Sequence, residues 1–403
     1  MINSLHNPRW LVLSNTEFIK EEFARINVHP AGVKMMSPRA DFIPIRLDNL
    51  TPPQAIIIKQ ELLSRGGEAA VSQGTVDNKV DKTKTLLLGT PDMYKGLIEN
   101  LRIQPFRLKK IAAELETILE YWINPLKFSL KLRDRSLRLF PEPAIMGIVN
   151  VTPDSFSDGG EFLSTDEAIK HALELAKEGA DIIDIGGESS RPGSDPVSEK
   201  DEIERVIPVI KGIRKKSKIP ISIDTTKPEV AKAAVKAGAD IINDISALSN
   251  GTELAEIAAK AKIPIILMHM KGTPKTMQKD TGYEDLMGEI IDYLRKASLK
   301  AIECGVKDTI VDPGIGFGKS LEGNCEILRR LYELRSLGLP VLVGPSRKST
   351  IGKLLGDAPV DKREFGTAAA VALSVAGGAN IIRVHNVKDM KDVVKVSSGI
   401  LNL

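Results

Sequence analysis

The amino-acid sequence predicts an α/β protein in which a (β/α)8 TIM barrel follows a small N-terminal α/β domain. From Ala144 onward, short apolar runs alternate about eight times with stretches of helical spacing. Such alternation is typical of a parallel sheet, and about eight units in roughly 260 residues favour closure of that sheet into a barrel. An open, doubly wound sheet is the alternative.

The domain boundary is expected at Pro141-Glu142-Pro143, because each proline lacks a backbone donor and disfavours helix in the residue before it. We therefore assign residues 1–140 to the N-terminal domain and a linker, and residues 141–403 to the barrel. In the first part, Thr51-Pro52-Pro53 predicts a helix start, TLLLG at 85–89 a strand, and Thr90-Pro91 and PFRLKKIAAELETILEYW two more helices. No catalytic arrangement stands out there, which favours a stabilising or interaction role.

The barrel strands are predicted in order at AIMGIV, DIIDIG, IPISID, ADIINDI, IPIILMHM, DTIVDPG, LPVLVG and ANIIRVH. Helix starts support this division. Ser164 to Glu167 can cap the helix after the first strand, and Pro228 suits the first turn of another.

Composition excludes several classes of function. The formal net charge of +3 is too small to indicate a nucleic-acid partner. No run of eighteen apolar residues occurs and the N-terminus lacks a basic segment followed by a long apolar run, so we expect neither a membrane span nor a leader, and a cytoplasmic location. Cys304 and Cys325 lack the spacing of a zinc site or disulfide framework.

Polar residues end or follow every predicted barrel strand, where a barrel places its reactive groups. They include Asn150, Glu188 to Arg191, Asp224, Asn243, His269, Asp312, Ser346 to Ser349 and Arg383 to His385. A single such residue is often only a helix cap, but caps do not call for Arg191, Lys348 and Arg383. The arginines suit a diphosphate, whereas Asp224, Asp312 and Asn243 suit a heterocycle that presents N–H donors.

No Ser or Cys nucleophile stands in a triad context, which favours a reaction without an enzyme nucleophile, such as departure of diphosphate from a stabilised cationic carbon. The protein would act by stabilising charge on the leaving group and by positioning the acceptor.

Eight motifs in order resemble those of the dihydropteroate synthase family of pterin-binding TIM barrels. They are MGIVNVTPDSFSDGG (146–160), GGESSRPG (186–193), SIDTTKPEV (222–230), INDI (242–245), LMHMKGTPKTMQ (267–278), DPGIGFGK (312–319), GPSRKS (344–349) and RVHNV (383–387). The resemblance spans about residues 144–403, so the chain resembles the long family members that carry an N-terminal extension. It implies a transferase that joins 6-hydroxymethyl-7,8-dihydropterin diphosphate to p-aminobenzoate in folate biosynthesis, with Mg²⁺ as cofactor and a homodimeric assembly.

The resemblance also implies residue roles. Asn150 would bind the magnesium, and Asp158 would act on metal-bound water or in closure of the first loop. Arg191, Arg383 and His385 would hold the diphosphate. Asp224, Asn243, Asp312 and Lys348 would bind the pterin, and Phe156, Ser190, Pro192 and Ser349 would line the p-aminobenzoate site. The catalytic set would be Asp158, Arg191, Lys348, Arg383 and His385; Met268, His269 and Lys319 are weaker candidates.

The chain departs from the family pattern at Ser190, where threonine is more common, at Pro345, and at Asn386, where aspartate is common. These departures leave open a different aryl acceptor. Two other readings are a pterin-dependent methyltransferase, which would not need SSRPG, SRKS or the R-x-H motif, and a non-enzymatic pterin-binding scaffold.

Overall fold

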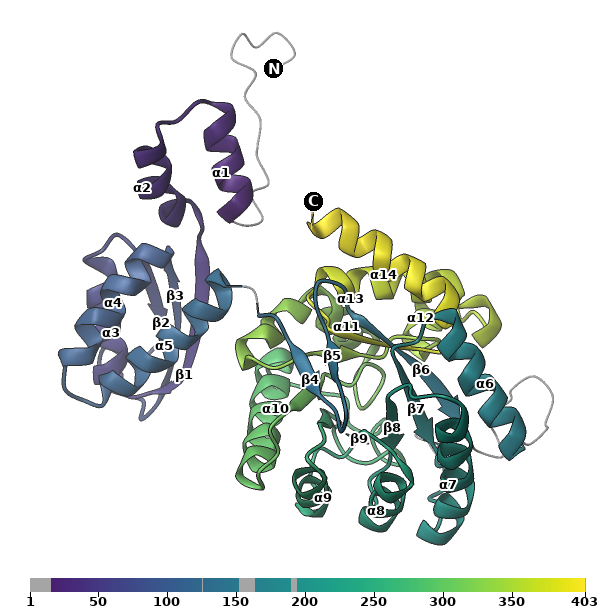
Figure 1. The fold of residues 1–403 in the computed structure, drawn as a ribbon. Coiled ribbons are helices and arrows are strands. Elements are labelled where there is room, and N and C mark those ends of the chain that lie inside the picture. Colours follow the sequence, from purple (N-terminus) through teal and green to yellow (C-terminus); the bar gives the residue numbers. More distant parts are fainter. Residues whose placement is uncertain (1–15, 125, 152–163, 190–193, 403) are drawn as a thin grey trace. The chain divides into compact units, whose positions relative to one another are not determined.

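The computed structural model describes residues 16–124, 126–151, 164–189 and 194–402, and the chain divides into two compact units, 1–125 and 126–403 (Figure 1). The second unit therefore begins ahead of the expected boundary at Pro141. The reason is a short hairpin within residues 126–140 whose leucines pack against the barrel strands.

The first unit is a small α/β domain built on an antiparallel sheet in the order β1-β3-β2. Its elements are α1 (Thr16–Arg25), α2 (Pro30–Ala40), β1 (Ile43–Leu50), α3 (Pro52–Leu63), β2 (Glu68–Val71), β3 (Thr83–Gly89), α4 (Pro91–Ile103) and α5 (Leu108–Ile123). Ile58, Leu87, Leu97 and Leu115 are fully buried in its core. The structure confirms the predicted α3, β3, α4 and α5 and adds the elements that the sequence analysis did not predict.

The second unit is a barrel of eight parallel strands, as predicted. The strands are β6 (Ala144–Asn150), β7 (Ile182–Gly186), β8 (Ile221–Asp224), β9 (Ile241–Asp244), β10 (Ile265–Met268), β11 (Thr309–Asp312), β12 (Leu342–Val343) and β13 (Ile381–Val384). They pair in the order β11-β10-β9-β8-β7-β6-β13-β12. Val311 pairs with Val341, and its N–H donates to Pro340 O at 2.9 Å, so the two edge strands also meet.

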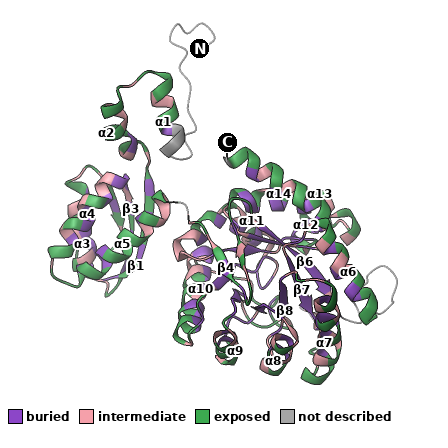
Figure 2. Cartoon of the chain, in the orientation of Figure 1, coloured by how far each residue is buried: buried purple, intermediate pink, exposed green. Residues whose placement is uncertain are grey.

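Helices surround the strands and expose their polar faces, whereas the strands are almost entirely buried (Figures 1 and 2). They are α6 (Thr165–Glu178), α7 (Glu199–Lys216), α8 (Pro228–Ala237), α9 (Glu253–Ala261), α10 (Leu286–Glu303), α11 (Leu321–Arg329), α12 (Ser349–Leu354), α13 (Glu364–Ala376) and α14 (Val387–Asn402), with short 3-10 helices η1 (Leu331–Leu337) and η2 (Val360–Lys362). Ser164 caps α6 together with Glu167, and Pro228 opens α8, as predicted. No helix in the described part of the chain is both long enough and apolar enough to cross a bilayer.

The end of the barrel at which the strands begin is closed by apolar side chains. The hairpin of β4 (Ser129–Lys131) and β5 (Ser136–Arg138) buries Leu130, Leu132 and Leu139. They form one cluster with an inward residue from seven strands: Met146, Ile182, Ile241, Ile266, Ile310, Leu342 and Ile381.

Two positions further along the same strands, the inward side chain is of a different kind. Side chains of a strand alternate between its two faces, so position i+2 points the same way as position i. The step leads from Ile182 to Asp184, from Ile241 to Asn243, from Ile310 to Asp312 and from Ile381 to Arg383. These four strands thus carry apolar residues into one end of the barrel and polar residues into the other.

Candidate active site

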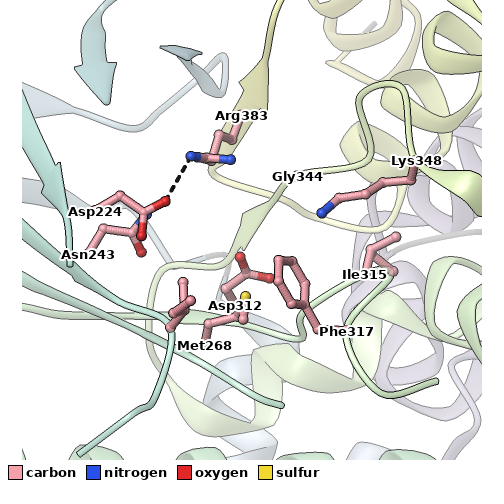
Figure 3. A pocket seen from close by; sticks show the side chains of 10 residues that line it. Asp224, Asn243, Met268, Asp312, Ile315, Phe317, Gly344, Lys348 and Arg383 are labelled. Atoms are coloured by element: carbon pink, nitrogen blue, oxygen red, sulfur yellow. Dashed lines mark hydrogen bonds and ion pairs between the residues drawn. The ribbon is translucent and has the colours of Figure 1, made fainter. Parts of the chain in front are cut away.

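A pocket lies where the barrel strands end (Figure 3). It is lined by Asp224, Asn243, Ile245, Met268, Asp312, Ile315, Phe317, Gly344, Lys348 and Arg383. Five of these are predicted site residues, and they come from β8, β9, β11, β13 and the start of α12. Segments spread over the whole barrel sequence therefore bring two acids, an amide, a lysine and an arginine to one pocket.

The other predicted residues fall into two groups. Asn150 ends β6 opposite Gly186, Ser349 is exposed at the start of α12, and His385 follows β13. Phe156, Asp158, Ser190, Arg191 and Pro192 lie outside the described residues, so their placement in the first and second loops stays a prediction.

An ion-pair cluster centred on Arg383 forms one wall of the pocket. Arg383 Nε donates to Asp184 Oδ2 at 2.7 Å, and Nη2 lies 2.6 Å from the same oxygen and 3.1 Å from Asp224 Oδ2. The Asp184 side chain has no exposed surface, and that of Asp224 is 14% exposed. Two nearly buried carboxylates thus share a single guanidinium.

This environment changes the acidity of Asp224. Burial raises the pKa of its carboxyl group to about 7, and the negative charge of Asp184 adds to that shift, while Arg383 opposes it. A buried carboxylate next to a like charge is expected to hold its proton more tightly. Asp224 therefore changes charge near neutral pH, where a donor-rich ligand would favour the ionised form.

Asp312 occupies a buried position beside a loop that only glycine can form. Burial raises the pKa of its carboxyl group to about 6, although Gly314 N–H donates to Oδ1 at 2.7 Å and lowers it. Gly314 has φ +69°, and a Cβ there would lie 2.0 Å from His269 O. Any side chain at 314 would displace the donor that holds Asp312.

Lys348 reaches across the pocket to an aromatic ring. Its Nζ lies 4.1 Å from the centre of the Phe317 ring, within the range of a cation–π contact. Burial and the nearby Arg383 lower the pKa of the ammonium to about 8, against the opposing charges of Asp312 and Asp224. The pocket therefore contains a lysine that is easily deprotonated as well as acids that are easily protonated.

Of the three weaker candidates, one lines the pocket and two are buried in the adjoining loops. Met268 lines the pocket. Lys319 is buried and donates to His269 O at 3.1 Å and Phe317 O at 2.8 Å, so it joins the two loops that carry these residues. The His269 ring is buried, with its centre 4.9 Å from that of Tyr293, and burial lowers its pKa to about 3. His269 thus packs as a neutral core residue.

His385 is held by the preceding loop. Ser346 Oγ lies 2.9 Å from its Nδ1, and the His385 backbone N–H donates to the same hydroxyl oxygen at 3.3 Å. These two contacts hold the imidazole ring beside the loop that carries Ser346.

The described residues fit a magnesium ion only if the ligand supplies most of its coordination. They contain no group of three His, Cys, Asp or Glu side chains that could hold a metal. The Asn150 amide oxygen offers one oxygen ligand, and magnesium commonly keeps several waters and binds through few protein ligands plus phosphate oxygens.

Two residues of the site, Asp184 and Phe317, are not among those predicted from the sequence. Asp184 was treated only as part of a strand, yet its position between the inward residues Ile182 and Gly186 places it inside the barrel. A carboxylate at an inward strand position needs a partner, and that was the available signal. Nothing in the sequence distinguished Phe317 from a loop anchor.

Comparison with known proteins gives a consistent result. Residues 146–385 match the family model described as pterin binding enzyme. A dihydropteroate synthase of Synechocystis sp. is 48% identical over 289 residues, which are 71% of this chain and 99% of that protein. Among solved structures, a Yersinia pestis dihydropteroate synthase in complex with a sulfonamide drug is 41% identical, with a TM-score of 0.66 over 68% of this chain and 100% of that one. The enzyme of Xanthomonas albilineans with 4-aminobenzoic acid is 42% identical, with a TM-score of 0.64 over 68% and 98%.

Proposed function

The chain belongs to the dihydropteroate synthase family of pterin-binding enzymes, and from this membership we propose that its barrel joins 6-hydroxymethyl-7,8-dihydropterin diphosphate to p-aminobenzoate. The products are 7,8-dihydropteroate and pyrophosphate. The observation that supports this most directly is the meeting of Asp224, Asn243, Asp312, Lys348 and Arg383 around one pocket. The acceptor assignment draws on the Xanthomonas albilineans relative, whose structure contains 4-aminobenzoic acid.

The pterin ring presents both donors and acceptors, and the pocket offers partners for each. The carboxylates of Asp224 and Asp312 and the amide oxygen of Asn243 accept from ring N–H and amino groups. Lys348 donates to ring oxygen or nitrogen acceptors. An ionised Asp224 is the form that accepts such bonds, so kcat/KM falls as the pH drops through the pKa of about 7.

The reaction proceeds by an SN1-like displacement. The bond between the pterin methylene carbon and the diphosphate oxygen breaks, and its electron pair leaves with pyrophosphate. The amine nitrogen of p-aminobenzoate then forms the new C–N bond and gives up a proton. None of the described residues that line the pocket is a serine or cysteine, in keeping with a route without an enzyme nucleophile.

Charge neutralisation at the diphosphate is assigned to Arg191, Arg383 and His385. Arg383 uses Nε and Nη2 for its carboxylate partners, which leaves Nη1 donors for an anion. Magnesium held in part by Asn150 would neutralise the diphosphate and make it a better leaving group. Asp158 is assigned to the first loop, and Phe156, Ser190, Pro192 and Ser349 to the acceptor site.

The test is direct assay of the purified chain with pterin diphosphate, Mg²⁺ and either p-aminobenzoate or a ribosylated aryl amine, with mass detection of both products. The proposal expects 7,8-dihydropteroate and pyrophosphate in equal amounts and a much higher kcat/KM for p-aminobenzoate. A higher kcat/KM for the ribosylated amine would show that this amine is the acceptor, while the type of reaction would stay as proposed. Absence of both products would reject the function.

A further inference from the structure

We propose that Asp184 is a positioning residue of this pocket, which holds the Arg383 guanidinium and the Asn243 amide in the orientations that meet the substrate. The inference rests on the proposed function, because it concerns the same pocket. Asp184 is not among the lining residues, and it acts through its two neighbours.

Asp184 makes hydrogen bonds to two residues that line the pocket. One oxygen of Asp184, Oδ2, accepts from Arg383 Nε at 2.7 Å and from Asn243 Nδ2 at 3.3 Å. It thus joins β7, β9 and β13 across the barrel interior. An arginine side chain has many rotamers, and fixing its Nε edge leaves the opposite edge of the planar guanidinium turned away from Asp184.

Asp184 also fixes the direction in which the Asn243 amide points. A carboxylate only accepts hydrogen bonds, so Asn243 has to turn its NH₂ group toward Asp184. Its carbonyl oxygen is then the atom left for the pocket, and it suits a ring edge that presents N–H donors. Without Asp184 the amide is free to present either end.

Burial of the Asp184 carboxylate carries a desolvation cost. Asp184 is fully buried, and its second oxygen, Oδ1, accepts no hydrogen bond from the residues that the structure describes. A buried ion pair usually contributes no more stability than apolar packing of the same volume. The cluster is therefore better explained by the groups it orients than by the stability it adds.

Asp184 also acts on Asp224 through its charge. The charged groups facing Asp224 are Asp184 from β7, Arg383 from β13, Glu202 from α7 and Lys348 at α12. Burial is the largest cause of the raised pKa of Asp224, and Asp184 is the next; Glu202 raises it further, while the two cations lower it. Neutralising Asp184 should therefore lower the pKa of Asp224.

The experiment compares Asp184→Asn and Asp184→Ala with the matched control Asp244→Asn. Asp244 is also a fully buried strand carboxylate, but it binds Ser246 and the N–H of Leu248 and does not line the pocket. Measured are kcat and KM for each substrate, the pH profile of kcat/KM, and Tm.

We expect Asp184→Ala to lower kcat/KM for the pterin diphosphate on the order of 100-fold, as misplacement of binding groups can. Asp184→Asn, which keeps an acceptor oxygen, should lose less and move the acidic limb of the pH profile down by about one unit. Asp244→Asn should lower Tm without moving that limb. If Asp184→Ala does not fold, the inference is tested by the kcat/KM and the pH profile of Asp184→Asn.

The inference is overturned if Asp184→Asn leaves the acidic limb at its wild-type position and changes kcat/KM no more than the control does. Failure of the proposed function would look different, because the wild-type chain itself would form no dihydropteroate. In that case, titration of 6-hydroxymethylpterin into the same proteins decides: weaker binding by the Asp184 variants than by Asp244→Asn supports the inference, and equal binding rejects it.

Discussion

The two ends of the barrel interior are built on the same strands but follow opposite rules. At the end closed by the β4–β5 hairpin, every inward side chain of the cluster is apolar, and none needs a hydrogen-bond partner. At the pocket end, buried acids and bases depend on one another, and the pKa values of Asp224 and Lys348 are shifted toward neutrality. A distance of two residues along a strand therefore separates side chains that stabilise the fold from side chains that serve the chemistry and can lower its stability.

The largest expected effect comes from removing the hairpin. Deletion of residues 1–140 would expose the apolar end of the barrel and remove Leu130, Leu132 and Leu139, each contributing roughly 1.5–3 kcal/mol by burial. That loss is comparable with the total stability of a typical domain, about 5–15 kcal/mol. Deletion of residues 1–125 keeps the hairpin and should leave kcat and the barrel's unfolding transition unchanged. Both truncations are tested by chemical denaturation, by turnover and by their mass in solution. The prediction would be contradicted if the chain lacking residues 1–140 were as stable as the chain lacking residues 1–125.

Lys348→Ala should impair the pocket without affecting the apolar end of the barrel. It removes the cation proposed to face the ring acceptors, so we expect kcat/KM to fall about 1,000-fold, equivalent to about 4 kcal/mol. Stability should hold or rise, because a half-buried ammonium, whose pKa is lowered by desolvation, is lost. The matched control is Lys353→Ala on the exposed side of α12. A large drop in Tm for Lys348→Ala, or near wild-type turnover, would count against the assignment.

Asp224→Asn should lower activity but raise the stability of the fold at neutral and higher pH. Because its folded-state pKa of about 7 lies above the ordinary value of 3.8, the carboxyl group stabilises the fold fully only below about pH 4, and this contribution is lost as the pH rises through 7. The neutral amide avoids that loss. We expect the variant to gain on the order of 1–4 kcal/mol relative to wild type between pH 4 and pH 8 while losing activity. Denaturant titrations of both proteins at both pH values check the sign. The prediction would be refuted if the stability of Asp224→Asn relative to wild type were larger at pH 4 than at pH 8.

Phe317→Leu should give the smallest effect. It removes the cation–π contact with Lys348, worth about 0.5–2 kcal/mol, and should lower kcat/KM by no more than about 30-fold. Since the ring favours the charged ammonium, the basic limb of the pH profile should move below the pKa of about 8. Phe140→Leu offers a control at the other end, where Lys127 lies 4.8 Å from the ring centre. A basic limb that stays in place would show that the ring does not act on Lys348.

Much of this organisation could be predicted from the sequence because it depends on local periodicity. Apolar runs placed the eight strands, and the polar residue at the end of each run identified Asp224, Asn243, Asp312, Lys348 and Arg383 as neighbours in a pocket. In the N-terminal unit, Thr-Pro pairs indicated where α3 and α4 begin.

What could not be predicted depends on contacts between distant segments. The segment around Leu130 and Leu132 falls in the predicted linker ahead of Pro141, because its hydrophobic partners lie on strands far along the chain. The roles of Asp184 and Lys319 depend on what faces them across the barrel and on backbone carbonyls of neighbouring loops. Residue type and spacing do not show such partners.

The shortness of the barrel strands limits how this sequence can change in length. β11 has only four residues, and one residue inserted before Val311 would turn Val311 inward and send the Asp312 carboxylate toward the surrounding helices. The same slip in β9 or β13 would withdraw Asn243 or Arg383. Insertions and deletions should therefore be confined to the connecting segments, and designed variants of altered length should keep every strand intact.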